Sequence, residues 1–229
     1  MYVTAFLTLK WLLYSLALLV VLAALIPVTV TWIEHRQARD LQALTPYVPA
    51  AVEQKSRTAV VYFSRSGNTA FAARHVAKRL GAQLFEIQAP AYRLGLQGWS
   101  RAMLDARQHE ADIMPRTIDL SEFNTVYLGA PIWLYSPAPP IWDFVEHNRF
   151  DGKHIVLFNT FNSQFKAEYI DAFKAKVMEH GARSFEHRFV RRGRMTQQIS
   201  PDEMVSVIES EWFSEDAELR FDPSPISSQ

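Results

Sequence analysis

The N-terminal part of the chain carries a long apolar segment. From Trp11 to Ile33 the sequence runs for 23 residues without a charged side chain, and Leu, Val, Ala and Ile dominate it. As a helix this run would be about 34 Å long, which is enough to cross the hydrocarbon core of a bilayer. Aromatic residues stand near both ends, as they do at the two interfaces of a spanning helix. We therefore predict that residues 1–35 form a single-pass membrane anchor.

A cleaved signal peptide is the alternative for this segment, with Lys10 as its basic region and Ala23-Ala24 near the cut. The apolar part of a signal peptide usually has only about 7–15 residues, so the longer run favours a retained anchor. Arg36 and Arg39 follow the run, whereas Lys10 alone precedes it. This asymmetry places the soluble part on the cytoplasmic side of the cell membrane.

The body of the chain, residues 58–213, alternates between two kinds of pattern. Short apolar, β-branched runs suit buried parallel strands, and they predict strands at 58–63, 84–87, 125–130, 154–159 and 184–190. Between them lie helical patterns, namely 72–80, 99–111, 141–147, 166–180 and a helix from Ser200 to about Trp212. Strands interleaved with helices indicate an α/β domain with a parallel sheet covered on both faces.

Two segments flank this domain. Pro46 and Pro49 mark residues 36–57 as a linker, because proline ends a helix. Residues 214–229 are polar and contain two prolines, which predicts a disordered tail.

Composition excludes several functions. Lys plus Arg equals Asp plus Glu at 24 each, so no overall charge favours a nucleic-acid partner. The absence of cysteine excludes thiolate metal sites and a cysteine nucleophile. The seven histidines form no HxxxH or HExxH pair, so we expect no metal site, and we assign no catalytic residue.

The residues after the first strand form the most informative motif. They are Ser64, Arg65, Ser66, Gly67, Asn68 and Thr69, and they lead directly into a helix. Free backbone N–H groups, the positive end of the helix dipole and nearby hydroxyls are what a phosphate group requires. An ordinary capped helix start would need only one such polar residue. We therefore interpret the motif as a phosphate-binding loop, and the missing Walker lysine excludes a nucleoside-triphosphatase loop.

The sequence YFSRSGNT resembles the phosphate-binding loop of flavodoxins, and the order of elements over residues 58–213 is similar to that family. The resemblance implies a flavodoxin-like three-layer sandwich with a five-stranded parallel sheet of order 2-1-3-4-5. It also implies FMN as the cofactor. Ser64, Arg65, Ser66, Asn68 and Thr69 would then hold the FMN phosphate, with Gly67 permitting the close turn.

The loops after the third and fourth strands extend this resemblance. Trp133 and Tyr135 are our first and second choices for the aromatic wall beside the flavin ring, and ordinary core aromatics are the alternative. In the next loop, Thr160 and Asn162 would bond the polar edge of the ring, while Phe161 packs on it or shields it. The full set of cofactor-binding residues predicted in these two loops is Pro131, Ile132, Trp133, Leu134, Tyr135, Ser136, Asn159, Thr160, Phe161 and Asn162.

The pattern PxWxYSxPA also resembles flavin quinone reductases. From Thr58 onward the chain has 19 basic and 21 acidic residues, whereas electron-shuttling flavodoxins are typically far more acidic. We therefore expect an FMN-dependent oxidoreductase or electron carrier that acts on a quinone or a membrane-associated redox partner protein. The alternative is an interaction module that has lost FMN, because glycines common in the family are missing here.

A cluster of basic residues follows the fifth strand. Lipid headgroups, an NADPH phosphate or a partner protein would suit it, but a solvated edge is the commoner explanation for such a cluster. The cluster comprises Arg188, Arg191, Arg192 and Arg194.

Overall fold

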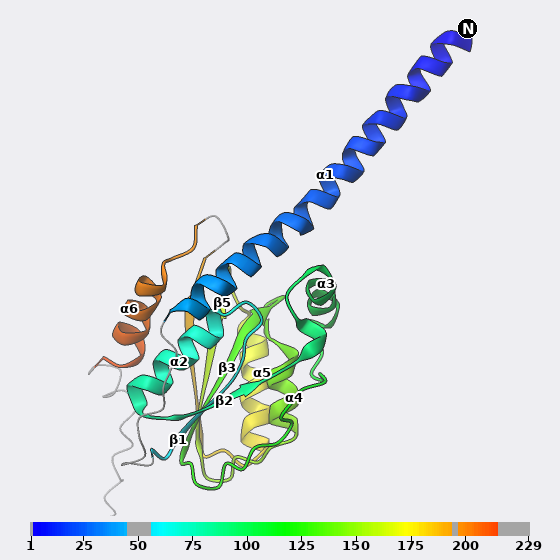
Figure 1. The fold of residues 1–229 in the computed structure, drawn as a ribbon. Coiled ribbons are helices and arrows are strands. Elements are labelled where there is room, and N and C mark those ends of the chain that lie inside the picture. The colour runs from blue at the N-terminus through cyan, green and yellow to red at the C-terminus, as the bar shows by residue number, and fades with distance from the viewer. Residues whose placement is uncertain (1, 45–55, 194–196, 215–229) are drawn as a thin grey trace, which may run out of the picture.

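The computed structural model describes residues 2–44, 56–193 and 197–214. Its centre is a sheet of five parallel strands in the order β2-β1-β3-β5-β6 (Figure 1). This is the order that the flavodoxin resemblance implied. The strands are β1 (Thr58–Phe63), β2 (Gln83–Ile87), β3 (Thr125–Trp133), β5 (His154–Phe161) and β6 (Ser184–Arg191). A two-residue strand that the sequence did not predict, β4 (Ser136–Pro137), pairs antiparallel with the end of β3.

Helices cover both faces of the sheet. The helices α2 (Asn68–Leu80) and α6 (Pro201–Trp212) lie on one face, and α4 (Pro139–Glu146) and α5 (Ala167–Glu179) lie on the other (Figure 1). The central strands β1, β3 and β5 are buried along nearly their whole length, which explains their continuous apolar sequences. Each face of the sheet therefore has its own apolar core, and the helices leave the ends of the strands uncovered.

The connection between β2 and β3 carries two short helices, η1 (Pro90–Tyr92) and α3 (Leu96–Asp105). The predicted helix 99–111 thus begins three residues earlier and ends six residues earlier. Gly98 and Ala102 are its buried residues. Figure 1 shows α3 at the same end of the domain as the long N-terminal helix.

The N-terminal helix α1 (Tyr2–Ala43) is longer than predicted. Among the described residues it is the one helix long and apolar enough to cross a membrane, and its most apolar window is not buried in the protein. The helix continues through residues 36–43, which the sequence placed in a linker, and Ala38 and Leu41 are buried there. Residues 45–55 of that linker and 215–229 of the predicted tail lie outside the described residues.

Candidate functional site

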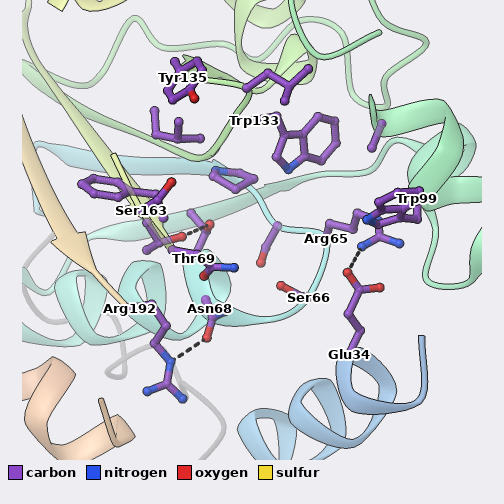
Figure 2. Close-up of a pocket in the computed structure, with 18 of the residues that line it drawn as sticks. Glu34, Arg65, Ser66, Asn68, Thr69, Trp99, Trp133, Tyr135, Ser163 and Arg192 are labelled. Carbon is purple, nitrogen blue, oxygen red and sulfur yellow. Dashed lines mark hydrogen bonds and ion pairs between the residues drawn. The ribbon is translucent and has the colours of Figure 1, made fainter. Parts of the chain in front are cut away.

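A cleft of about 310 Å³ opens at the carboxyl ends of the parallel strands (Figure 2). This size falls near the lower end of the range for small-molecule sites, and the position is where open α/β sheets bind ligands. The loops after β1, β3 and β5 form most of its walls. All the residues predicted to bind the cofactor line this cleft except Gly67, Ser136 and Asn159.

The loop after β1 has a geometry suited to an anion. The N–H of Gly67 donates to Ser64 Oγ at 3.2 Å, which closes the turn. Gly67 has a φ of 93° and stands at the N-cap of α2. Because glycine has no side chain, this N-cap residue accepts no hydrogen bond from the N–H groups of the first turn of α2. Those N–H groups are therefore available to a ligand.

Gly67 also makes close contact with the N-terminal helix. A Cβ at position 67 would lie 3.3 Å from Leu41 Cδ1, so a larger residue would be crowded as well as strained by its positive φ. The buried side chains of Leu41 and Ala38 therefore support the loop from the side of α1. Gly67 shapes the loop through its backbone, although it does not line the cleft.

Arg65 links the loop to two other elements. Its Nη1 pairs with Glu34 Oε1 of α1 at 2.5 Å, and its Nη2 donates to the carbonyl of Gly95 at 3.3 Å (Figure 2). The side chains of this ion pair are only 7% and 15% exposed. Arg65 Nε and Glu34 Oε2 are nevertheless buried without a hydrogen-bond partner among the described residues.

Arg192 approaches the loop from the end of β6. It is 7% exposed, and its Nε donates to Asn68 Oδ1 at 3.1 Å (Figure 2). Burial lowers the pKa of Arg192, because the charged form loses hydration. Its Nη1 is a further buried donor without a partner in the described part of the chain. Buried donors on two arginines favour a ligand that is an anion and accepts hydrogen bonds.

The arginines of the predicted basic cluster have different surroundings. Arg192 lies in the cleft and not on a solvated edge, whereas Arg191 is exposed. Arg188 pairs with Glu186 at 2.9 Å and is turned toward α6. Arg194 lies outside the described residues.

Trp133 both packs in the core and faces the cleft. Its ring packs edge-to-face on Phe63 at 5.7 Å and on Tyr92 at 5.1 Å between centroids, yet it also lines the cleft. The Tyr92 hydroxyl donates to Asp105 at 3.2 Å, and burial together with this carboxylate raises the pKa of Tyr92 to about 12. Trp133 is thus a wall fixed from behind by a buried aromatic cluster.

A tight turn follows Trp133 and forms the edge of the cleft. Leu134 has a φ of 42° and Tyr135 a φ of 78°, between strands that pair Trp133 with Ser136. Two positive φ values at the centre of a two-residue hairpin are typical of a type I′ turn, which normally uses Asn or Gly. The N–H of Lys166 donates to the Tyr135 carbonyl at 3.1 Å, and the Lys166 ammonium lies 5.6 Å from the Tyr135 ring centre. These contacts hold the turn in its strained conformation.

The loop after β5 completes the cleft. Thr160, Phe161 and Asn162, which the sequence predicted to contact the cofactor, line it. Thr160 Oγ1 lies 2.8 Å from Thr69 Oγ1, and this buried hydrogen bond ties the loop to the start of α2. The end of β5 and the first turn of α2 are therefore fixed relative to each other.

Ser136 and Asn159 lie behind the cleft. The Ser136 hydroxyl is buried and accepts from Trp142 Nε1 at 3.3 Å. Asn159 is fully buried, donates to the Ala130 carbonyl at 2.8 Å and lies 2.9 Å from His187 Nε2. Both side chains support the walls of the cleft without reaching its interior.

The structure adds cleft residues that sequence reasoning missed. Trp99, Ala102 and Met103 come from α3, Glu34 comes from α1, and Ser163 and Gln164 extend the loop after β5. No pattern in the sequence indicated that Glu34, just beyond an apolar span, would reach a loop 30 residues away.

The cleft as a whole has two chemically different ends. In Figure 2 the rings of Tyr135, Trp133 and Trp99 lie on one side, and the loop residues Ser66 and Asn68 lie on the other. Helix N–H groups and arginines would bind an anionic group, while the aromatic rings would bind a flat apolar one. Among the described residues, no group of three or more His, Asp or Glu side chains could hold a metal ion.

Fold and site together define an α/β protein with a ligand cleft at the carboxyl edge of a doubly covered sheet. A flavodoxin family model matches residues 57–182. The chain therefore belongs to the flavodoxin family. No curated protein matches it.

The fold is also similar to that of a solved structure. A putative flavoprotein from Bacteroides uniformis matches with a TM-score of 0.53 and 23% identity, covering 68% of this chain and 99% of its own. A flavoprotein from Lactobacillus acidophilus, solved in complex with FMN, matches with a TM-score of 0.46 and 18% identity, covering 57% of this chain and 91% of its own.

Proposed function

We propose that this chain is a membrane-anchored flavodoxin that binds FMN in the cleft and transfers electrons at the membrane surface. The observation that carries the proposal is the joint arrangement of the loop after β1 with Arg65 and Arg192. These residues place an uncapped helix N-terminus beside buried guanidinium groups that have unpartnered donors. Family membership makes a flavin phosphate the fitting ligand.

The phosphate end of FMN would occupy the loop after β1. Backbone N–H groups at the start of α2 would donate to its oxygens, together with the side chains of Ser66, Asn68 and Thr69. Arg192 would supply positive charge and a hydrogen bond from its free Nη1. Arg65 would add charge from the other side of the loop, held in place by Glu34.

The ring end would lie along the aromatic side of the cleft. Trp133 is rigidly held and would pack against the ring, with Tyr135 beside it at the edge. Thr160 and Asn162 would bond the polar edge of the ring, and Phe161 would exclude water. When bound, the flavin supplies the ability to accept and release one or two electrons, which no protein side chain here provides.

The N-terminal helix would act as a retained membrane anchor. Its uncharged run ends at Ile33, and the next residue, Glu34, already contacts the domain. A redox centre held in this way has a high effective concentration for membrane partners. We therefore propose a quinone or a membrane-bound redox protein as the electron acceptor, in keeping with the nearly balanced charge of the domain.

Purification of the full chain in detergent tests the proposal. We expect a yellow protein that absorbs visible light as an oxidised flavin does. Ser66→Asp would place a carboxylate against the phosphate and should lower flavin retention through like-charge repulsion. Ser210→Asp adds the same charge at an exposed position of α6 and serves as the control. A colourless protein that takes up no added FMN would refute the function, and equal retention by both variants would place the phosphate elsewhere.

A further inference from the structure

One face of α3 is apolar, exposed and next to the proposed membrane span. Leu96 is 51% exposed and Trp99 is 38% exposed, and the half-buried Met103 follows on the same helical face, seven residues after Leu96. Trp99 and Met103 also line the cleft. Gly98 and Ala102 are the buried residues of this helix, and Ala102 lines the cleft as well. This face, which we define as Leu96, Trp99 and Met103, is thus both an apolar surface and one rim of the cleft.

Arg65 fixes the position of α3 relative to the end of the apolar run in α1. Its Nη1 pairs with Glu34, which directly follows the last uncharged residue, Ile33. Its Nη2 donates to the carbonyl of Gly95, the residue that precedes α3. One side chain therefore joins the end of the apolar run to the start of α3, and Figure 1 shows α3 alongside this part of α1.

Polar and aromatic residues around this point are those found where a span leaves a bilayer. Trp32 is 57% exposed on α1, and the Arg36 guanidinium lies 5.7 Å from its ring centre. The next residue of α1, Gln37, donates from Nε2 to Gln198 Oε1 at 2.7 Å, which holds Gln198 beside α1. Tryptophan is enriched at membrane interfaces, and arginine interacts there with anionic headgroups.

We propose that the face formed by Leu96, Trp99 and Met103 lies in the interfacial layer of the bilayer that α1 spans. The proposal rests on the anchoring in the proposed function. It assigns a lipid bilayer as the partner of α3 and places the Trp99 rim of the cleft at the membrane surface. An electron acceptor dissolved in the lipid would then reach the cleft without leaving the interface.

The cysteine-free chain allows a direct test by site-directed spin labelling of the full-length protein. Single cysteines would be placed by Leu96→Cys on the α3 face, by Leu18→Cys within the span, and by Met178→Cys as the control. Met178 is also an exposed apolar residue, at 37%, but it lies near the end of α5, at the opposite edge of the sheet. Each protein would be labelled and placed in vesicles of phosphatidylcholine and phosphatidylglycerol.

The measured quantity is the collision rate of each label with oxygen, which enters lipid, and with a water-soluble nickel chelate. We expect the ratio of oxygen to nickel collisions at position 96 to exceed the ratio at position 178 severalfold. A ratio at 96 equal to that at 178, with the label at 18 in lipid, would refute the inference alone. A water-exposed label at 18 would refute the anchoring as well. Dipolar broadening between labels at position 96 would show that a second copy covers the face, and would also overturn the proposal.

Discussion

Arg192 offers the sharpest test of the phosphate site. Arg192→Gln removes a buried guanidinium whose Nη1 has no partner among the described residues and whose Nε bonds Asn68. In the FMN complex we expect that Nη1 to donate to the phosphate. A hydrogen bond to a charged group contributes about 1.5–3 kcal/mol, which corresponds to a loss of affinity of roughly 10- to 150-fold.

The assay compares FMN with riboflavin, which has the same ring system but no phosphate. Apoprotein would be titrated with each flavin, and quenching of flavin fluorescence would give the dissociation constant. We expect Arg192→Gln to weaken FMN binding by the factor above and to leave riboflavin binding nearly unchanged. The variant should therefore reduce the preference for FMN over riboflavin.

Arg191→Gln is the matched control, because it removes the same charge from the neighbouring, exposed residue. Solvent and salt screen an exposed charge, so its effect on FMN affinity should stay within roughly threefold. Equal weakening of both flavins by Arg192→Gln, or equal FMN affinities of the two variants, would contradict a contact between Arg192 and the phosphate.

Three further outcomes follow from the structure. In urea denaturation, Tyr135→Val should have a free energy of unfolding about 1–2 kcal/mol lower than Tyr135→Asn, because a β-branched residue tolerates the φ of 78° poorly. Equal stability of the two variants would contradict a strained backbone at this turn. Burial lowers the pKa of His187 to about 4, whereas the pKa in an unfolded chain is about 6.5. Between these pH values the unfolded state binds a proton that the folded state does not. The free energy of unfolding should therefore fall by roughly 2–3 kcal/mol from pH 6.5 to pH 4. His187→Gln should flatten that fall, and an unchanged pH profile would show that another group causes it. Leu41→Ala should expose residues 36–43 to cleavage by trypsin, because it removes a buried contact with the loop at Gly67. Leu44→Ala is the control and should not have this effect, because Leu44 is 39% exposed. Equal cleavage of both variants would contradict the packing of α1 on the domain.

Local signals in the sequence predicted much of the fold. The continuous apolar runs correctly predicted the central strands. A parallel sheet between two helical layers is buried on both faces, so its central strands do not alternate apolar and polar residues. The helix predicted to begin at Ser200 does so, and a capping box between Ser200 and Glu203 fixes its first turn. At the other end of a helix, Gly81 closes α2 with a φ of 58°, which glycine adopts without strain.

The parts that were missed depend on contacts between residues distant in the sequence. Residues 36–43 are polar enough to resemble a linker, but the burial of Ala38 and Leu41 shows that this part of α1 packs on the domain. Arg192 resembled a solvated edge residue until its bond to Asn68, 124 positions away, placed it in the cleft. Asn159 was predicted to face a ligand, yet its side chain points to Ala130 and His187, because the geometry of a strand end cannot be derived from residue type.

The central claim is that this cleft holds a phosphorylated flavin in the intact, anchored protein. The most direct measurement is to denature the purified full-length chain, release any bound cofactor and determine its mass and its amount per chain. We predict FMN at one molecule per chain, either as purified or after incubation with FMN and removal of the excess. Retention of no flavin, or equal retention of riboflavin and FMN, would contradict it.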